Sequence, residues 1–62
     1  MNKELKFEDL EVGKLYKSSL PNGKLGFIFV LLKIDKYDFC DILTKNGISK
    51  YKFSKERIYF EL

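Results

Sequence analysis

The sequence has no histidine, no tryptophan, one cysteine and one proline among its 62 residues. Without histidine there is no His-based general acid or base, no Ser–His pair and no imidazole ligand for a metal. A single cysteine excludes an internal disulfide framework, and the apolar neighbours of Cys40 predict a buried, reduced thiol in a cytoplasmic protein. We therefore expect a protein that is not an enzyme and that binds no cofactor or metal.

Long apolar runs and phosphate-binding glycine motifs are also missing. The longest apolar run is far below membrane-spanning length, and Met1–Leu5 contains no apolar signal core. The four glycines are scattered, without the spacing of a phosphate-binding loop. Asp35, Asp38 and Asp41 come nearest to a carboxylate cluster, but they lack the spacing of a calcium loop and favour a solvated turn. We expect no contact with a membrane.

Charge and hydrophobicity predict one small, mildly basic domain. Twelve Lys and Arg residues oppose nine acidic residues, a net charge of +3 that is too small to require a polyanionic partner. Hydrophobic residues make up 45% of the chain and aromatic residues 16%, which is enough for a compact core. We expect a single domain over residues 1–62, with residues 1–12 as an N-terminal segment. The preference for Lys over Arg indicates an AT-rich coding sequence, as in low-GC bacteria and their phages.

Turn signals divide the chain into short strands, which we place at residues 14–18, 26–34, 39–44, 48–53 and 58–62. Leu20-Pro21-Asn22-Gly23 favours a turn, because Pro presets φ and Gly tolerates a positive φ. Asn46-Gly47 predicts a type I′ hairpin, in which both central residues need a positive φ. Ser54 can cap one helical or 3-10 turn over residues 54–57. The composition of residues 3–10 favours a further helical turn.

This order of elements resembles the SH3-like small β-barrel over residues 13–62. The resemblance rests on five short strands, a tight hairpin before the fourth and a 3-10 or helical turn before the last, and it implies an all-β, five-stranded small barrel. The ALYDY-like motif and groove tryptophan of Src-type SH3 domains, the ribosomal KOW pattern and the Tudor aromatic cage are not recognisable, so recognition of Pro-rich peptides is not implied. An OB-like barrel, also five-stranded but usually longer than 62 residues, is the alternative.

The segment 26–34 is the most informative, because both faces of its strand are apolar. A strand in a small antiparallel sheet normally presents one polar face to water. We assign one face to the core: Ile28, Val30, Leu32 and Ile34. The opposite face either enters the barrel at a bend, or is covered by Leu5, Phe7 and Leu10 of the N-terminal segment, or is open to a partner. The candidate protein-binding residues are Phe27, Phe29 and Leu31, with Lys33 at their edge.

We expect a small, non-catalytic protein-binding module, such as a phage-encoded adaptor or inhibitor, whose partner is another protein or a second copy of the chain. The alternative is a nucleic-acid-binding small β-barrel that uses a basic face: Lys50, Tyr51, Lys52, Lys55 and Arg57. Basic side chains beside an aromatic ring suit a surface that follows phosphates and stacks on bases. The same pattern is also typical of a solvent-facing strand with Tyr51 and Phe53 in the core. A purely structural subunit is a third possibility.

Overall fold

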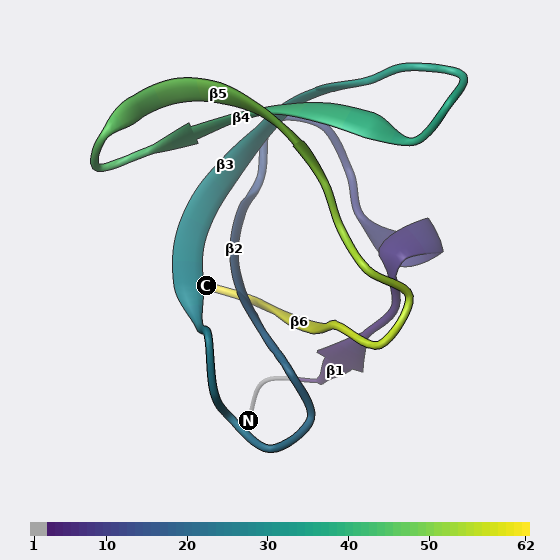
Figure 1. The fold of residues 1–62 in the computed structure, drawn as a ribbon, viewed down its shortest axis with the longest axis vertical. Coiled ribbons are helices and arrows are strands. Elements are labelled where there is room, and N and C mark those ends of the chain that lie inside the picture. Colours follow the sequence, from purple (N-terminus) through teal and green to yellow (C-terminus); the bar gives the residue numbers. More distant parts are fainter. Residues whose placement is uncertain (1–2) are drawn as a thin grey trace.

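In the computed structural model, which describes residues 3–62, six antiparallel strands form one strongly bent sheet (Figure 1). In chain order the strands are β1 (Glu4–Leu5), β2 (Leu15–Ser19), β3 (Phe27–Ile34), β4 (Phe39–Thr44), β5 (Gly47–Lys52) and β6 (Ile58–Glu61). A 3-10 helix, η1 (Phe7–Asp9), lies between β1 and β2. The order in the sheet is β1-β6-β2-β3-β4-β5, so the sheet has two edges and is not closed.

The all-β prediction is confirmed, but the sheet has six strands and is open where we predict a five-stranded barrel. The additional strand, β1, pairs with β6 through Glu4–Phe60 and Leu5–Tyr59. It occupies the first part of residues 3–10, and the helical turn expected in that range forms after it, as η1. Ser54 to Arg57 form a turn closed by the Arg57 N–H and the Ser54 carbonyl (3.3 Å), without a 3-10 helix. The first two residues of the predicted domain lie outside the described residues. Within residues 3–62, no helix has the length and hydrophobicity to cross a membrane.

The β4–β5 hairpin forms at the predicted place with a different turn. Thr44 pairs with Gly47 across it, and Lys45 and Asn46 form its tip. Of these residues only Gly47 has a positive φ, 105°, whereas a type I′ turn needs two. One positive φ at a glycine is typical of a type I turn followed by a glycine bulge. The Asn-Gly pair therefore locates the hairpin but does not fix its type.

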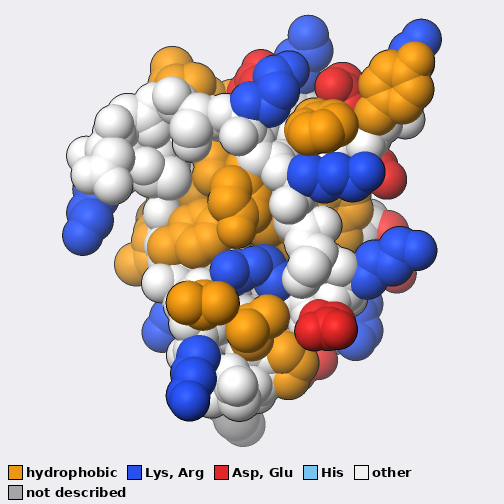
Figure 2. All heavy atoms as spheres, viewed as in Figure 1, with side chains coloured by type: hydrophobic (Ala, Val, Ile, Leu, Met, Phe, Trp, Pro, Cys, Tyr) orange, Lys and Arg blue, Asp and Glu red, His pale blue; other side chains and the backbone are white. Residues whose placement is uncertain are grey.

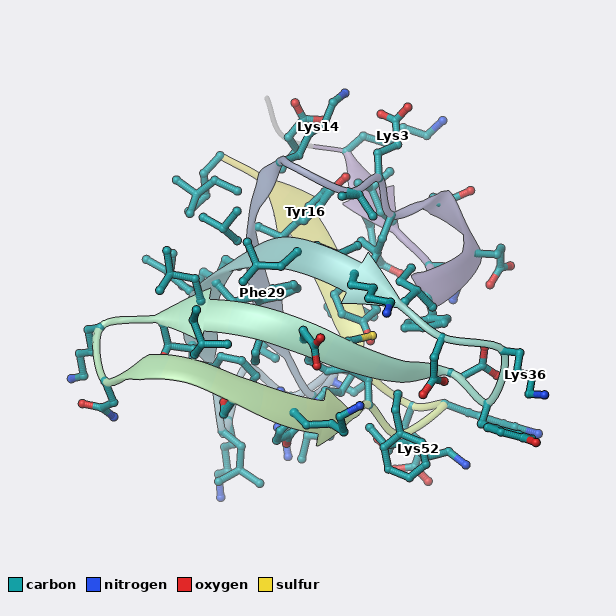
Figure 3. The ribbon with its side chains drawn as sticks, turned by 90° about the horizontal axis from the view of Figure 1, so that it is seen from above. Lys3, Lys14, Tyr16, Phe29, Lys36 and Lys52 are labelled. Atoms are coloured by element: carbon teal, nitrogen blue, oxygen red, sulfur yellow. The ribbon has the colours of Figure 1, made fainter. Side chains whose placement is uncertain are left out.

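The core lies on the inner face of the bent sheet and consists mainly of aromatic rings. Its buried members are Leu10, Tyr16, Phe29, Leu31, Cys40, Ile42, Phe53 and Tyr59. In Figure 3, Tyr16 and Phe29 point into the space between the strands. Leu5 and Phe7 pack against this cluster, so the N-terminal segment covers the core as one of the predicted alternatives has it. The prediction that Cys40 is buried is also confirmed, because its side chain is 0% exposed.

β3 turns inward the face of Phe29 and Leu31, for which the sequence leaves burial and an open surface as alternatives, and the assignment of the other face to the core is wrong for all its members except Ile34. Phe29 is 1% exposed and Leu31 is fully buried, whereas Ile28 is 52% and Leu32 is 36% exposed. The cross-strand partner of Phe29 on β2 is Tyr16, which is also buried. Cross-strand partners share a face, so the rings of neighbouring strands gather on one side of the sheet and leave the aliphatic side chains on the other.

A β-bulge explains why Ile34 does not follow Leu32. The pairing of β3 with β4 shifts register between Leu31 and Lys33. An extra residue in one strand reverses the face to which later side chains point. Ile34 therefore packs against the core cluster on the same side as Leu31. Strict alternation of faces places Ile34 beside Leu32, because it assumes a regular strand without a bulge.

The hydroxyl of Tyr59 is buried and has no hydrogen-bond partner among the described residues. Burial also raises the pKa of this phenol, chiefly through desolvation. A buried hydroxyl without a partner destabilises the folded state, so Tyr59→Phe should raise the free energy of unfolding in urea by about 1 kcal/mol. Tyr16→Phe is the matched control: its hydroxyl accepts the Glu11 N–H at 2.8 Å, and its loss should lower stability by about 1 kcal/mol. Equal destabilisation by the two substitutions would contradict this interpretation.

The thiol of Cys40 should be unreactive in the folded protein. Desolvation by burial raises its pKa, and the nearby Asp38, Asp35 and Asp41 carboxylates raise it further. Only the thiolate reacts with a disulfide reagent, so modification by DTNB at neutral pH should be slow and should track unfolding as urea is added. Fast, stoichiometric modification without denaturant would show that the thiol is accessible.

Candidate functional site

The predicted protein-binding residues do not form one surface. Phe29 and Leu31 lie inside the core and are almost fully buried. Lys33 is exposed and pairs across the sheet with Asp41 of β4. Phe27 is half-buried and is the only one of the three apolar residues that reaches the surface. The reason is volume: the two Phe rings of β3 are needed to fill the aromatic core.

The predicted basic face is also divided. Lys50 and Lys52 are exposed. The Lys50 Nζ lies 3.8 Å from the Asp41 carboxylate, and the Lys52 Nζ lies 5.3 Å from the centroid of the Phe39 ring. Tyr51, between them, turns to the inner face and packs against Phe53 as predicted, with ring centroids 4.8 Å apart.

The remaining two members of that set lie on the turn before β6. Lys55 is exposed, while Arg57 is only 8% exposed. The five residues therefore belong to separate environments, because neighbours in a strand alternate between its faces.

An open groove lies where the β4–β5 hairpin diverges from β3. The pairing of β4 with β3 ends at Leu43–Val30, which leaves the first residues of β3 without a neighbour on that side. The hairpin tip forms one wall of the groove, and the loop between β2 and β3 forms another. In Figure 2, hydrophobic side chains fill the hollow beside the hairpin and basic side chains stand at its border. The groove is thus a consequence of the open sheet.

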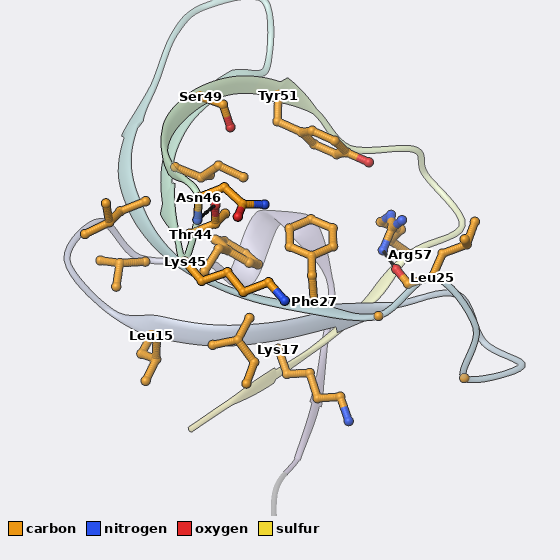
Figure 4. A pocket seen from close by; sticks show the side chains of 17 residues that line it. Leu15, Lys17, Leu25, Phe27, Thr44, Lys45, Asn46, Ser49, Tyr51 and Arg57 are labelled. Carbon is orange, nitrogen blue, oxygen red and sulfur yellow. Dashed lines mark hydrogen bonds between the residues drawn. The ribbon is translucent and has the colours of Figure 1, made fainter.

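The rings of Phe27 and Tyr51 and the guanidinium group of Arg57 line the inner part of the groove, beside the buried ring of Phe29 (Figure 4). The Phe27 ring meets the Tyr51 ring edge-on at 5.5 Å, with an interplanar angle of 66°. The Arg57 Cζ lies 5.1 Å from the centroid of the Phe27 ring, within range of a cation–π interaction. Phe27 is also stacked on Phe53 of the core, with centroids 6.0 Å apart. These groups form a fixed, partly apolar surface that is continuous with the core.

Arg57 also holds the loop between β2 and β3 in place. Its Nη1 donates to the Leu25 carbonyl at 2.9 Å and to the Ser18 Oγ at 3.3 Å. Leu25 has a φ of 54°, a left-handed conformation that disfavours a residue with a Cβ, and its side chain is 70% exposed. The loop thus places a strained, exposed leucine on the rim of the groove.

The charges that line the groove are all positive. Lys17, Lys45 and Arg57 are among its lining residues, and no Asp or Glu is. In Figure 4, the side chain of Lys45 extends from the hairpin tip toward Phe27. The lining offers hydrogen-bond donors and aromatic surface, which suit a ligand with negative charges and apolar or aromatic parts. Within residues 3–62, no group of three or more His, Cys, Asp or Glu side chains could hold a metal ion.

A second accessible feature, which we call the outer aliphatic patch, lies on the face of the sheet opposite the core. It consists of Leu15, Ile28, Val30, Leu32, Leu43 and Ile48. A row of direct cross-strand partners runs through it, from Leu15 to Val30, Leu43 and Ile48. Ile48 is 70% exposed and Leu43 is 42% exposed. The far end of the groove reaches this patch, so the two features are contiguous.

Part of the patch was within reach of sequence reasoning. Lys50 and Lys52 are predicted to point away from the core, and period 2 puts Ile48 on their side of β5. The hairpin then pairs Ile48 with Leu43, so both residues are expected on the outer face. Leu25, Lys17 and Lys45 carry no such signal, because their meeting at the groove depends on the bend of the sheet.

The sequence and the structure were also compared with known proteins. No protein-family model matches the chain, and neither a curated protein nor a solved structure matches it. Function is therefore inferred from the geometry of the groove and of the outer aliphatic patch.

The strain at Leu25 gives a stability prediction. Leu25→Gly should raise the free energy of unfolding by about 1 kcal/mol, because glycine adopts a positive φ without the steric cost of a Cβ. Ile48→Gly is the matched control: Ile48 is equally exposed but lies in a regular strand, where glycine should lower stability by about 1 kcal/mol. Chemical unfolding of both variants measures the difference. A loss of stability in Leu25→Gly as large as in the control would show that the loop carries no strain.

Proposed function

We propose that this chain is a small, non-catalytic protein-binding module and that the outer aliphatic patch is its contact surface. The observation that supports this is the row of aliphatic side chains that faces solvent across β2, β3, β4 and β5. Contiguous exposed apolar surface on a small protein marks interaction sites, because its burial removes apolar area from water. This proposal keeps the function inferred from the sequence and moves its contact to the opposite face of β3.

The partner that fits best is a second copy of the chain. The patch itself carries no charge, so two copies can bring their patches together without burying an unpaired ion. It spans about 14 Å across four strands and about 13 Å along β3, from the usual strand spacing and rise. The area enclosed by these two lengths is well below the roughly 800 Å² that each partner buries in a standard interface. The proposed association is therefore weak and reversible.

We also propose that the fold is an open variant of the SH3-like small barrel and that the protein is located in the cytoplasm. The strands β2 to β5 are consecutive neighbours and β6 returns to the side of β2, which supports this resemblance. The N-terminal strand β1 is then an addition at the edge of β6. The lone, buried thiol of Cys40 supports the location, since disulfides are rare in the reducing cytosol.

Self-association should depend on the centre of the patch. Sedimentation velocity of the wild-type chain, from about 10 μM to about 1 mM, should show a concentration-dependent rise in mass. Leu43→Lys places a charge opposite Ile48 and should weaken association by about tenfold or more. Val12→Lys is the control, because Val12 is 59% exposed and lies outside the patch. A strictly monomeric wild-type chain, or equal weakening by both substitutions, would rule out the patch as a contact between copies.

A further inference from the structure

Arg57 has an unusual environment for a charged residue. It is 8% exposed, and no described carboxylate lies within ion-pair distance of its guanidinium group. Its Nη1 donates hydrogen bonds to two neutral acceptors, the Leu25 carbonyl and the Ser18 hydroxyl. A buried charge is normally paired, because removal from water is costly. The positive charge of Arg57 thus has no negative counterpart in residues 3–62.

The unused donors of Arg57 remain open to the groove. A guanidinium group carries five N–H donors, and the hydrogen bonds of Arg57 to Leu25 and Ser18 use only Nη1. Tyr59 alone, within the described part of the chain, has a side-chain nitrogen or oxygen atom that is sealed from solvent without a partner. The other nitrogen atoms of Arg57 are therefore not completely sealed from solvent, and Arg57 itself lines the groove. Its planar donor array matches the oxygen atoms of a phosphate or carboxylate group.

The groove as a whole favours a ligand with several negative charges. Lys17 and Lys45 line it together with Arg57, and no acidic side chain offsets them. Both lysines are exposed, so their side chains are free to contact the anionic groups of a ligand. Arg57, in contrast, is held in one position by its hydrogen bonds. One donor group held in place and two exposed cations suit a polymer with regularly spaced anionic groups.

The aromatic lining favours a nucleic acid over an acidic peptide as the anionic polymer that binds. Tyr51 is half-buried: its ring leans against Phe53 and Phe27, and it lines the groove. An aromatic ring beside cations is the arrangement that stacks on nucleobases while basic side chains contact phosphates. An acidic peptide would use the cations but would not need a ring.

We propose that the groove binds a short segment of single-stranded nucleic acid. Arg57 binds one backbone phosphate, Lys17 and Lys45 contact its neighbours, and a base stacks against Tyr51. Recognition is largely independent of sequence, because stacking accepts every base and Arg57 is the only arginine in the chain. This inference differs from the basic face predicted from the sequence, since Lys50 and Lys52 lie outside the groove. The four residues assigned to phosphate and base contacts lie outside the outer aliphatic patch, although the groove reaches that patch at its far end.

The first test is fluorescence anisotropy with a labelled oligo-dT of about twelve nucleotides, at about 50 mM and about 200 mM salt. We expect binding that weakens steeply as salt rises. Lys45→Glu should weaken it by about tenfold, and Arg57→Met by at least as much. Lys36→Glu makes the same change of net charge on the turn between β3 and β4, outside the groove, and should change affinity less than about twofold.

The second test separates the ligand classes with three further probes. An abasic oligomer with the same phosphates should bind about tenfold more weakly, because it cannot stack. A duplex of equal length and a poly-glutamate peptide of equal charge should also bind more weakly than oligo-dT. Thermal melting of each variant confirms that it is folded, and Lys45→Glu, on an exposed hairpin tip, keeps the test valid if Arg57→Met does not fold.

Several results would overturn the proposal. These are no binding of oligo-dT at low salt, equal weakening by Lys36→Glu and Lys45→Glu, or equal affinity for the abasic and normal oligomers. Tighter binding of poly-glutamate would assign the groove to acidic peptides instead. The binding of these probes is measured at low protein concentration, where weak self-association does not contribute. A lack of nucleic-acid binding is therefore distinct from a lack of self-association through the patch.

Discussion

The packing of one aromatic cluster holds this protein together. Phe53, just beyond β5, contacts rings from four elements: Phe7 of η1 at 6.3 Å, Phe27 and Phe29 of β3 at 6.0 and 5.1 Å, Tyr51 of β5 at 4.8 Å and Tyr59 of β6 at 5.4 Å. In a chain of 62 residues without a disulfide, burial of such rings is the main source of stability. The bend of the sheet lets rings from strands on both sides meet at one residue.

Both candidate binding features follow from this cluster. Because the large rings of β2 and β3 occupy the inner face, the aliphatic side chains of these two strands are left on the outer face, where they form the patch together with Leu43 of β4 and Ile48 of β5. Because the sheet bends around the cluster without closing, the hairpin separates from the start of β3. Phe27 and Tyr51, at the border of the cluster, then reach the groove. Arg57 covers this border, with its cation near the Phe27 ring and its Nη1 bonded to the loop of Leu25.

The elements of the fold were predictable because their signals are local. Gly23 and Gly47 adopt the positive φ values that turns require, and the strands between the turns have the expected β-branched and aromatic composition. β1 was not predictable, since Glu4 and Leu5 extend only by pairing with the distant β6. The candidate sites were predictable in part. Tyr51 and Arg57 were identified as basic-aromatic neighbours, but their common groove with Lys17 and Lys45 joins residues far apart in the chain.

By itself, the sequence determined the all-β class, the position of most strands, the tight hairpin and the burial of Cys40. Local backbone preferences and hydrophobicity suffice for these features, because each depends on a few adjacent residues. Tertiary structure decided which face of β3 is buried, and a bulge then sent Ile34 to the core side. Both faces of β3 are apolar, so the alternation of residues along the strand does not show which face is buried. Only packing against rings from other strands, which depends on volume and on the bend of the sheet, distinguishes one face from the other.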